Sequence, residues 1–252
     1  MIFRWSIWGS HVSKNIELLR YSVFTFKKQF GPTHQYVIYT DDAPRVSEHV
    51  GFDVDIRQFP LKDDSSFHVS SKATWMKWCP AARLDIDQTE FYIDSDVFLL
   101  KYPKEIDYFL KNDRLKFAIL DEYLGQSWQH GAMARKSTKQ TPFVNAGFFV
   151  QKAGCDITES LTREYSWWKE NIKPEEQTHH DEQGSLAIVL TEFALRGELY
   201  VLPKDIYMLI GPNENKDVQN LDDITMFHAV YPDHPAFYKF KNYLDDLLKR
   251  RF

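Results

Sequence analysis

The sequence lacks the features that mark several large classes of protein. Only two of its 252 residues are cysteines, Cys79 and Cys155, too few for a disulfide framework and too far apart for a local metal motif. No apolar run approaches the roughly 20 residues that a membrane-spanning helix needs, and no Asn-x-Ser/Thr sequon occurs. The N-terminal segment carries Arg4 among apolar residues, which is typical of a first strand rather than a signal peptide. We therefore expect a cytoplasmic protein.

An excess of positive charge is also missing. The formal net charge of −5 argues against a general nucleic-acid binder, so we expect no nucleic-acid partner. In contrast, 43% of the residues are hydrophobic and 15% are aromatic, which favours a sizeable core over global disorder. The length suits one large α/β domain or two small ones. Because no internal repeat and no linker divides the chain, we expect a single domain over residues 1–252.

Hydrophobic periodicity predicts strands that alternate with helices. Strands are expected at 2–8, Gln35–Thr40, around 52–56, and at Phe91–Leu100, Leu115–Leu120, Phe143–Gln151, 199–202 and 225–228. Helices are expected from a cap at Ser13 to Phe30, from about Ser71 to Leu84 with a kink at Pro80, and at 104–111, 157–170, His180–Leu195 and 235–250. This alternation predicts a largely parallel sheet covered on both faces. Residues 122–142 are polar without a clear period, and a loop of that length is usually functional or mobile.

The most informative motif is Asp94-Ser95-Asp96, inside the apolar run Phe91–Leu100. Because strand side chains alternate between faces, Asp94 and Asp96 are expected on the same face. Two neighbouring carboxylates there repel one another and lose hydration. A divalent cation relieves both penalties, since hard cations favour oxygen ligands.

Two other interpretations of the acid pair remain. The carboxylates could form a structural pair bonded to loop amides. A dehalogenase-type phosphatase or phosphotransferase also ends a strand with Asp-x-Asp. That family, however, usually has Thr or Val where this chain has Phe98, and its motif lies near the N-terminus.

A single amide interrupts the apolar strand Thr141–Val150. Asn145 would be buried there, and a buried amide requires hydrogen-bond partners. The small residues Ala146 and Gly147 leave room for close approach to the backbone. A bound sugar is one candidate occupant, and a strand bulge with a satisfied Asn is the alternative.

Two further polar sites follow along the chain. Asp181, Glu182 and Gln183 stand where a helix begins; they could hold sugar hydroxyls, or the acids could simply complement the helix dipole. His228 lies between apolar residues, either as a core histidine or as a third metal ligand beside the acid pair.

In this order, the four segments resemble the GT-A class of glycosyltransferases, most closely glycosyltransferase family 8 and related small nucleotide-sugar transferases. The matching segments are Phe-Tyr-Ile-Asp94-Ser-Asp96-Val, Val-Asn145-Ala-Gly147-Phe-Phe, Asp181-Glu-Gln183-Gly-Ser-Leu and Phe-His228. The resemblance implies a single GT-A-like, Rossmann-like α/β domain with a mostly parallel central sheet. It also implies a nucleotide-binding half over about 1–100 and an acceptor-binding half over about 101–252.

The resemblance implies a metal-dependent transfer of a sugar from a nucleotide sugar, usually a UDP-sugar, to a glycan or other hydroxyl acceptor. Asp94, Asp96 and His228 would hold Mn²⁺ or Mg²⁺ against the donor diphosphate, and mixed carboxylate and imidazole ligation suits Mn²⁺. The implied donor-binding residues are Ser6, Trp8, Asp41, Lys72, Lys77, Ser95 and Asn145. Either lysine could equally be a solvated helix residue.

Two departures from the family pattern leave the stereochemical course open. Glu182-Gln183 is followed by Leu186-Ala187, whereas the family often shows Asp-Gln followed by Leu-Asn. The usual Gly and Lys beyond the final His are replaced by residues 229–235. Asp181 or Glu182 as a carboxylate base would suit inversion, and the Gln183 amide near the anomeric carbon would suit retention.

The C-terminal segment Phe237–Phe252 combines aromatic residues with five basic ones. It could contact a membrane surface that carries a lipid-linked acceptor, or it could pack as an ordinary helix. Asp245 and Asp246 favour the packed helix. A nucleotide-sugar- or glycan-binding module without catalysis is the remaining alternative for the whole chain.

Overall fold

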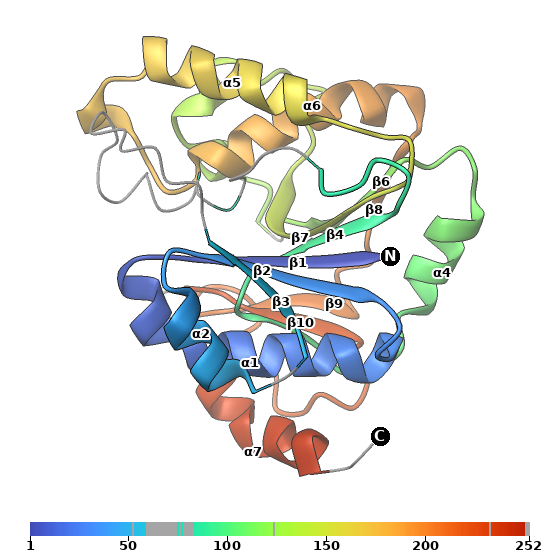
Figure 1. Ribbon diagram of the computed structural model, residues 1–252. Helices are drawn as coiled ribbons and strands as arrows, with labels where there is room; N and C mark the ends of the chain where they lie inside the picture. Colours follow the sequence, from blue (N-terminus) through green and yellow to red (C-terminus); the bar gives the residue numbers. More distant parts are fainter. Residues whose placement is uncertain are drawn as a thin grey trace.

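The computed structural model describes residues 1–51, 53–58, 75, 77, 83–122, 124–231 and 233–249. Its larger sheet has seven strands in the order β3-β2-β1-β4-β7-β6-β8 (Figure 1). Every neighbouring pair in that sheet is parallel except the two pairs formed by β7. The strands are β1 (Ile2–Ile7), β2 (Gln35–Thr40), β3 (Asp55–Gln58), β4 (Glu90–Ile93), β6 (Phe117–Asp121), β7 (Val144–Gln151) and β8 (Leu199–Val201). The prediction of an α/β fold with a mostly parallel sheet is confirmed.

A second sheet of three strands corrects the sequence analysis at its most important point. It contains β5 (Val97–Leu99), β10 (Met226–Ala229) and β9 (Tyr207–Ile210), in that order, and β9 was not predicted. The expected single strand Phe91–Leu100 is in fact β4 in the large sheet and β5 in the small one. Both strands are buried. Because β4 ends at Ile93 and β5 begins at Val97, the acid pair lies in the turn that passes from one sheet to the other.

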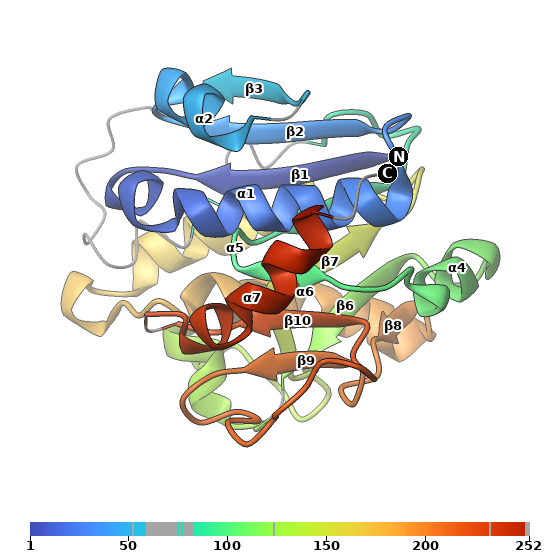
Figure 2. The same ribbon diagram turned by 90° about the horizontal axis from the view of Figure 1, so that it is seen from below.

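Helices cover both faces of the large sheet. In Figure 1, α1 (Ser10–Phe30) and α2 (Ala43–Val50) lie on one side, and α5 (Thr158–Asn171) and α6 (Asp181–Arg196) lie on the other. Figure 2 shows α7 (Pro235–Lys249) crossing over α1 beside the small sheet. The structure also describes the helices α4 (Lys104–Lys111), η2 (Ser127–Arg135) and η3 (Pro174–Glu176).

Several predicted boundaries need correction. The first helix begins at Ser10, three residues before the expected cap. The segment expected only to end the second strand instead begins α2, where Asp42 accepts a hydrogen bond from the Arg45 N–H and Pro44 occupies the first turn. The polar segment 122–142 contains η2. Most of the expected helix from Ser71, including Pro80, lies outside the described residues.

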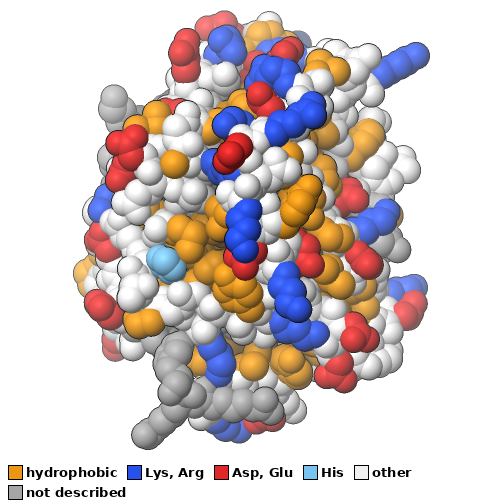
Figure 3. All heavy atoms as spheres, turned by 90° about the vertical axis from the view of Figure 1, so that its right-hand side faces the viewer, with side chains coloured by type: hydrophobic (Ala, Val, Ile, Leu, Met, Phe, Trp, Pro, Cys, Tyr) orange, Lys and Arg blue, Asp and Glu red, His pale blue; other side chains and the backbone are white. Residues whose placement is uncertain are grey.

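Alternation along β1 determines which side chains reach the site. Phe3, Trp5 and Ile7 are buried against α1 in the main apolar cluster. Because strand side chains alternate, Arg4 and Ser6 point to the opposite face. The parallel strands β1, β2 and β4 end on the left in Figure 1, and Asp94 follows directly from β4. Figure 3 shows the opposite end of the molecule, near α4 and the start of β1, where acidic and basic side chains are interspersed.

The apolar face of α7 is used for packing inside the protein. Ala236, Phe237, Phe240 and Leu244 are buried in a cluster that includes residues of α1 and the small sheet. In the part of the chain that the structure describes, no helix combines the length and the apolar character needed to cross a bilayer. Contact of the C-terminal segment with a membrane surface stays a prediction.

Candidate metal centre

The turn between β4 and β5 meets β10 at a group of three potential metal ligands. Asp94, Asp96 and His228 each offer one ligand atom, and these atoms all lie within 4.8 Å of one another. Two main-chain hydrogen bonds hold the turn: the Asp94 N–H donates to the Gly147 carbonyl at 2.8 Å, and the Ala229 N–H donates to the Asp96 carbonyl at 2.9 Å. Two carboxylates and one imidazole form a donor set that suits a divalent cation.

Hydrogen bonds fix which nitrogen of His228 faces this group. The Asn145 Oδ1 accepts the Gly147 N–H at 3.0 Å and lies 3.0 Å from His228 Nδ1. Because an amide oxygen only accepts, Nδ1 carries the proton. Nε2 is then the nitrogen that faces Asp96, 3.3 Å from Oδ1. A Cβ on Gly147 would stand 2.4 Å from His228 Cε1, so only glycine allows the ring this position.

Asp96 is held by two histidines. Besides His228, the Nδ1 of His234 lies 3.1 Å from Asp96 Oδ2. Burial opposes ionisation of Asp96, but the attraction of the two histidines outweighs it and holds the pKa of Asp96 well below its usual range. His234 was not among the residues predicted from the sequence.

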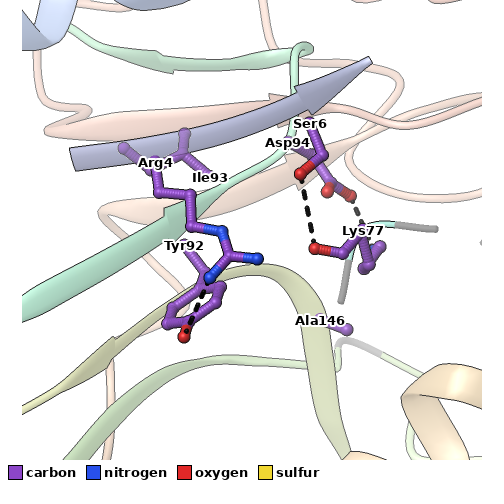
Figure 4. A pocket seen from close by; sticks show the side chains of 7 residues that line it. All are labelled: Arg4, Ser6, Lys77, Tyr92, Ile93, Asp94 and Ala146. Atoms are coloured by element: carbon purple, nitrogen blue, oxygen red, sulfur yellow. Dashed lines mark hydrogen bonds and ion pairs between the residues drawn. The ribbon is translucent and has the colours of Figure 1, made fainter. Parts of the chain in front are cut away.

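Asp94 is paired with a lysine instead. The Lys77 Nζ lies 3.0 Å from Asp94 Oδ2 (Figure 4). It also lies 3.1 Å from Oε1 of Glu182, at the start of α6. Burial would lower the pKa of Lys77, but the two carboxylates outweigh it and raise that pKa above its ordinary value. Burial raises the pKa of Asp94 and of Glu182, with Lys77 opposing in both. Glu182 Oε2 is buried without a hydrogen-bond partner among the described residues.

A further carboxylate, that of Glu122, connects two of the predicted site residues. Its Oε2 accepts hydrogen bonds from Asn145 Nδ2 at 3.0 Å and from Gln183 Nε2 at 3.1 Å. The Gln183 Oε1 accepts the Ala146 N–H at 3.1 Å, so α6 is tied to β7. Burial raises the pKa of Glu122. In the sequence, Glu122 is distinguished only as the first residue of the polar segment 122–142.

Asp181 does not join this group. Its side chain is fully buried, and its Oδ1 accepts from the Ala132 N–H at 2.8 Å and from Thr178 Oγ1 at 2.7 Å. The Oδ2 accepts from the indole N–H of Trp168 at 2.7 Å and from the Thr178 N–H at 2.9 Å. Four donors satisfy this carboxylate within the protein. It therefore holds η2, α5 and α6 together, and we assign it no part in the proposed chemistry.

The residues predicted to bind the donor lie mainly at two places, a small pocket beside Asp94 and the end of β1. A pocket of about 10 Å³, room for one water molecule, is lined by Arg4, Ser6, Lys77, Tyr92, Ile93, Asp94 and Ala146 (Figure 4). Within it, Ser6 Oγ donates to the Lys77 carbonyl at 3.4 Å. Ser95 is half-buried in the turn beside this pocket.

Trp8 and Asp41 lie at the end of β1, where the N–H of Gly9 donates to Asp41 Oδ2 at 2.8 Å. The ring of Trp8 makes an edge contact with His11. Asp41 Oδ1 is buried without a partner among the described residues. Lys72 falls outside the described residues.

The fold is similar to those of solved glycosyltransferases. An active-site glutamine-to-glutamate mutant of LgtC matches with a TM-score of 0.61 at 12% identity, covering 98% of this chain and 96% of that chain. The galactosyltransferase LgtC in complex with donor and acceptor sugar analogues matches with a TM-score of 0.57 at 12% identity, covering 100% and 98%. Mouse xyloside xylosyltransferase 1, in its apo form, matches with a TM-score of 0.54 at 11% identity, covering 90% and 97%. No family model matches the sequence, and no curated protein matches it significantly.

These similarities identify the fold as the GT-A fold of glycosyltransferases, which confirms the fold predicted from the sequence. The similarity extends over nearly the whole of each chain. At 11–12% identity it concerns the fold, and membership of glycosyltransferase family 8 stays a prediction.

Proposed function

We propose that this chain is a metal-dependent glycosyltransferase that moves a sugar from a nucleotide sugar to a hydroxyl acceptor. The observation that carries the proposal is the group of Asp94, Asp96 and His228 at the turn between two sheets of a GT-A fold. Fold alone would not specify an activity, because one fold hosts many chemistries. The ligand group and the hydrogen bonds that orient it supply the chemistry.

The proposed cofactor is Mn²⁺, with Mg²⁺ as the alternative. An imidazole beside two carboxylates favours Mn²⁺, since Mg²⁺ prefers oxygen ligands and water. When bound, such a cation neutralises charge that develops on the leaving diphosphate. The proton on His228 Nδ1 is fixed by Asn145, which leaves Nε2 as the nitrogen that would bind it.

The proposed donor is a UDP-sugar, bound mainly by residues 1–100. Ser6 lies near the end of β1, Trp8 follows β1 and Asp41 follows β2, at the strand ends where ligands bind in open parallel sheets, and these residues would meet the nucleoside. Lys77 lies against Asp94 and would contact a donor phosphate beside the metal. Ser95 would approach the same phosphates from the turn.

The proposed sugar-binding residues are Asn145, Glu182 and Gln183. Glu182 Oε2, which has no hydrogen-bond partner among the residues that the structure describes, would accept a hydrogen bond from a sugar hydroxyl. The similarity to an active-site glutamine mutant of LgtC supports a role for Gln183, whose amide is held in one orientation by Glu122 and Ala146. A glycan or glycoconjugate acceptor would approach from the half formed by residues 101–252.

The test is to incubate the protein with a panel of nucleotide sugars, with Mn²⁺, Mg²⁺ or EDTA, and to measure nucleotide release. We expect release from one class of donor, stimulated by the metal and abolished by EDTA. Donor binding in calorimetry without turnover on a broad acceptor panel would favour the binding module. Neither binding nor turnover with any donor would overturn the proposal.

A further inference from the structure

Two neighbouring residues close to the acid pair adopt an unfavourable backbone conformation. Asp233 has a φ of 57° and His234 a φ of 47°, in the left-handed region that non-glycine residues rarely enter. His234 also precedes Pro235, and a following proline disfavours helical backbone and favours extended conformations. Such strain is unfavourable and persists only where surrounding structure imposes it. It therefore calls for a reason at this place.

The strained backbone brings the ring of His234 to Asp96. The ring is buried, and its Nδ1 lies 2.7 Å from the Ala229 carbonyl and 3.1 Å from Asp96 Oδ2. Both partners are acceptors, so Nδ1 carries a proton and donates. The nitrogen that His234 turns towards Asp96 is thus the protonated one and cannot bind a metal there, whereas His228 faces Asp96 with its unprotonated Nε2.

His234 is connected to β10 on one side and to α7 on the other. Ala229 accepts from His234 through its carbonyl and donates through its N–H to the Asp96 carbonyl. Ala229 of β10 thus binds the main chain of Asp96, and His234 lies between Ala229 and the Asp96 side chain. On its other side, the Phe237 N–H donates to the His234 carbonyl at 3.0 Å, and Phe237 is fully buried. The strained residues are thus connected directly to the packed start of α7.

We propose that His234 is a positioning residue, whose Nδ1–H orients the Asp96 carboxylate to bind the metal. The inference rests on the proposed function, since it assumes that Asp96 is a metal ligand. Residues that orient metal ligands by hydrogen bonding commonly contribute about 10–100-fold to metal affinity.

The experiment uses side chains that place a donor at different distances from the backbone. His234→Asn keeps an N–H donor at the place of Nδ1, and asparagine also tolerates the left-handed backbone. His234→Gln has a similar size and polarity, but its amide lies one bond further out, at the place of Nε2. The affinity for Mn²⁺ alone is measured by electron paramagnetic resonance, and circular dichroism confirms folding. We expect His234→Asn to stay within about threefold of the wild type and His234→Gln to lose about 10–100-fold.

Equal Mn²⁺ affinity in the wild type and His234→Gln would overturn the role of His234. Equal losses of Mn²⁺ affinity in His234→Asn and His234→Gln would also overturn it, because an N–H donor at the position of Nδ1 would then not contribute to metal binding. These results leave the proposed function intact, provided that the wild type binds Mn²⁺. If the wild type binds no Mn²⁺, the metal dependence of the proposed function is wrong, and the positioning role falls with it.

Discussion

The two carboxylates of the acid pair are separated in sequence by a single residue, Ser95, and have opposite surroundings. Asp94 lies against an ammonium group, Lys77, which it shares with Glu182, and its side chain is 28% exposed. Asp96 lies between two imidazoles, and its side chain is only 10% exposed. The pKa of Asp94 is raised above its ordinary value by burial, whereas the histidines hold that of Asp96 well below it.

This difference assigns different tasks to the two acids. Asp96 stays ionised and is oriented from both sides, which is what a fixed metal ligand requires. Asp94 already has a cation partner at 3.0 Å, so a metal must compete with Lys77 for its oxygen. We infer that Asp96 and His228 define the metal position and that Asp94 completes it.

The largest expected effect is therefore the loss of Asp96. Asp96→Ala removes the ligand on which both histidines converge, and we expect Mn²⁺-dependent turnover to fall at least about 100-fold. Asp94→Ala leaves the ion pair between Lys77 and Glu182 in place, and it also leaves Asp96 and its histidines in place. The loss of Mn²⁺ affinity in Asp94→Ala should therefore be about tenfold smaller than the loss of Mn²⁺ affinity in Asp96→Ala. Nucleotide release and Mn²⁺ titration measure both effects.

A matched control for these variants is Asp113→Ala, at an exposed position before β6. It should leave turnover and Mn²⁺ affinity unchanged. Equal losses in Asp94→Ala and Asp96→Ala would contradict the division of tasks between the two acids.

Much of the fold follows from local sequence patterns. The apolar period of α1, the alternation in β1 and the polar breaks between segments predict most elements at nearly their observed bounds. The division of residues 91–100 between two sheets could not be predicted, because a continuous apolar run suits one long buried strand equally well. The small sheet depends on pairing of β5 with β10, across more than half of the chain, which no local pattern encodes.

The site was predictable only as far as its ligand types. Asp94, Asp96 and His228 have side chains that suggest metal binding, and the structure places their ligand atoms together. Their partners have no such signal, because contacts between distant segments create their roles. Glu122 lies 61 residues from Gln183 in sequence, and His228 lies 83 residues from Asn145. The one visible sign for His234 was that it lies within residues 229–235, where this chain departs from the pattern of the family that it resembles.

A smaller effect is expected from Lys77, where one substitution should strengthen Mn²⁺ binding and weaken donor binding. Lys77→Met removes the ammonium that competes for Asp94, so Mn²⁺ affinity without donor should rise about tenfold, or about 1.4 kcal/mol. Because we propose that Lys77 also contacts donor phosphate, the KM for the donor should rise by a similar factor. Lys77→Arg retains the charge and serves as the control, with smaller changes in both quantities. A lower Mn²⁺ affinity in Lys77→Met would show that the lysine supports the metal rather than competing with it.

The smallest effect on the metal is expected from Glu122, which acts on the Asp96 side only through Asn145 and His228. Glu122→Leu removes the acceptor of two buried hydrogen bonds, so the free energy of unfolding should fall by about 3 kcal/mol. Glu122→Gln keeps an oxygen that can accept both bonds and should lose less. Denaturant titration measures the stability of both variants.

The Mn²⁺ affinity of Glu122→Leu then shows how far orientation extends from the metal. Asn145 keeps its contacts with Gly147 and His228 Nδ1 in that variant, so His228 should retain its proton on Nδ1. The affinity should therefore fall by less than about tenfold, the lower end of the range for direct partners of metal ligands. A loss as large as that of His234→Gln would mean that the buried network beneath β7, rather than the pair of histidines around Asp96, determines the geometry of the metal centre.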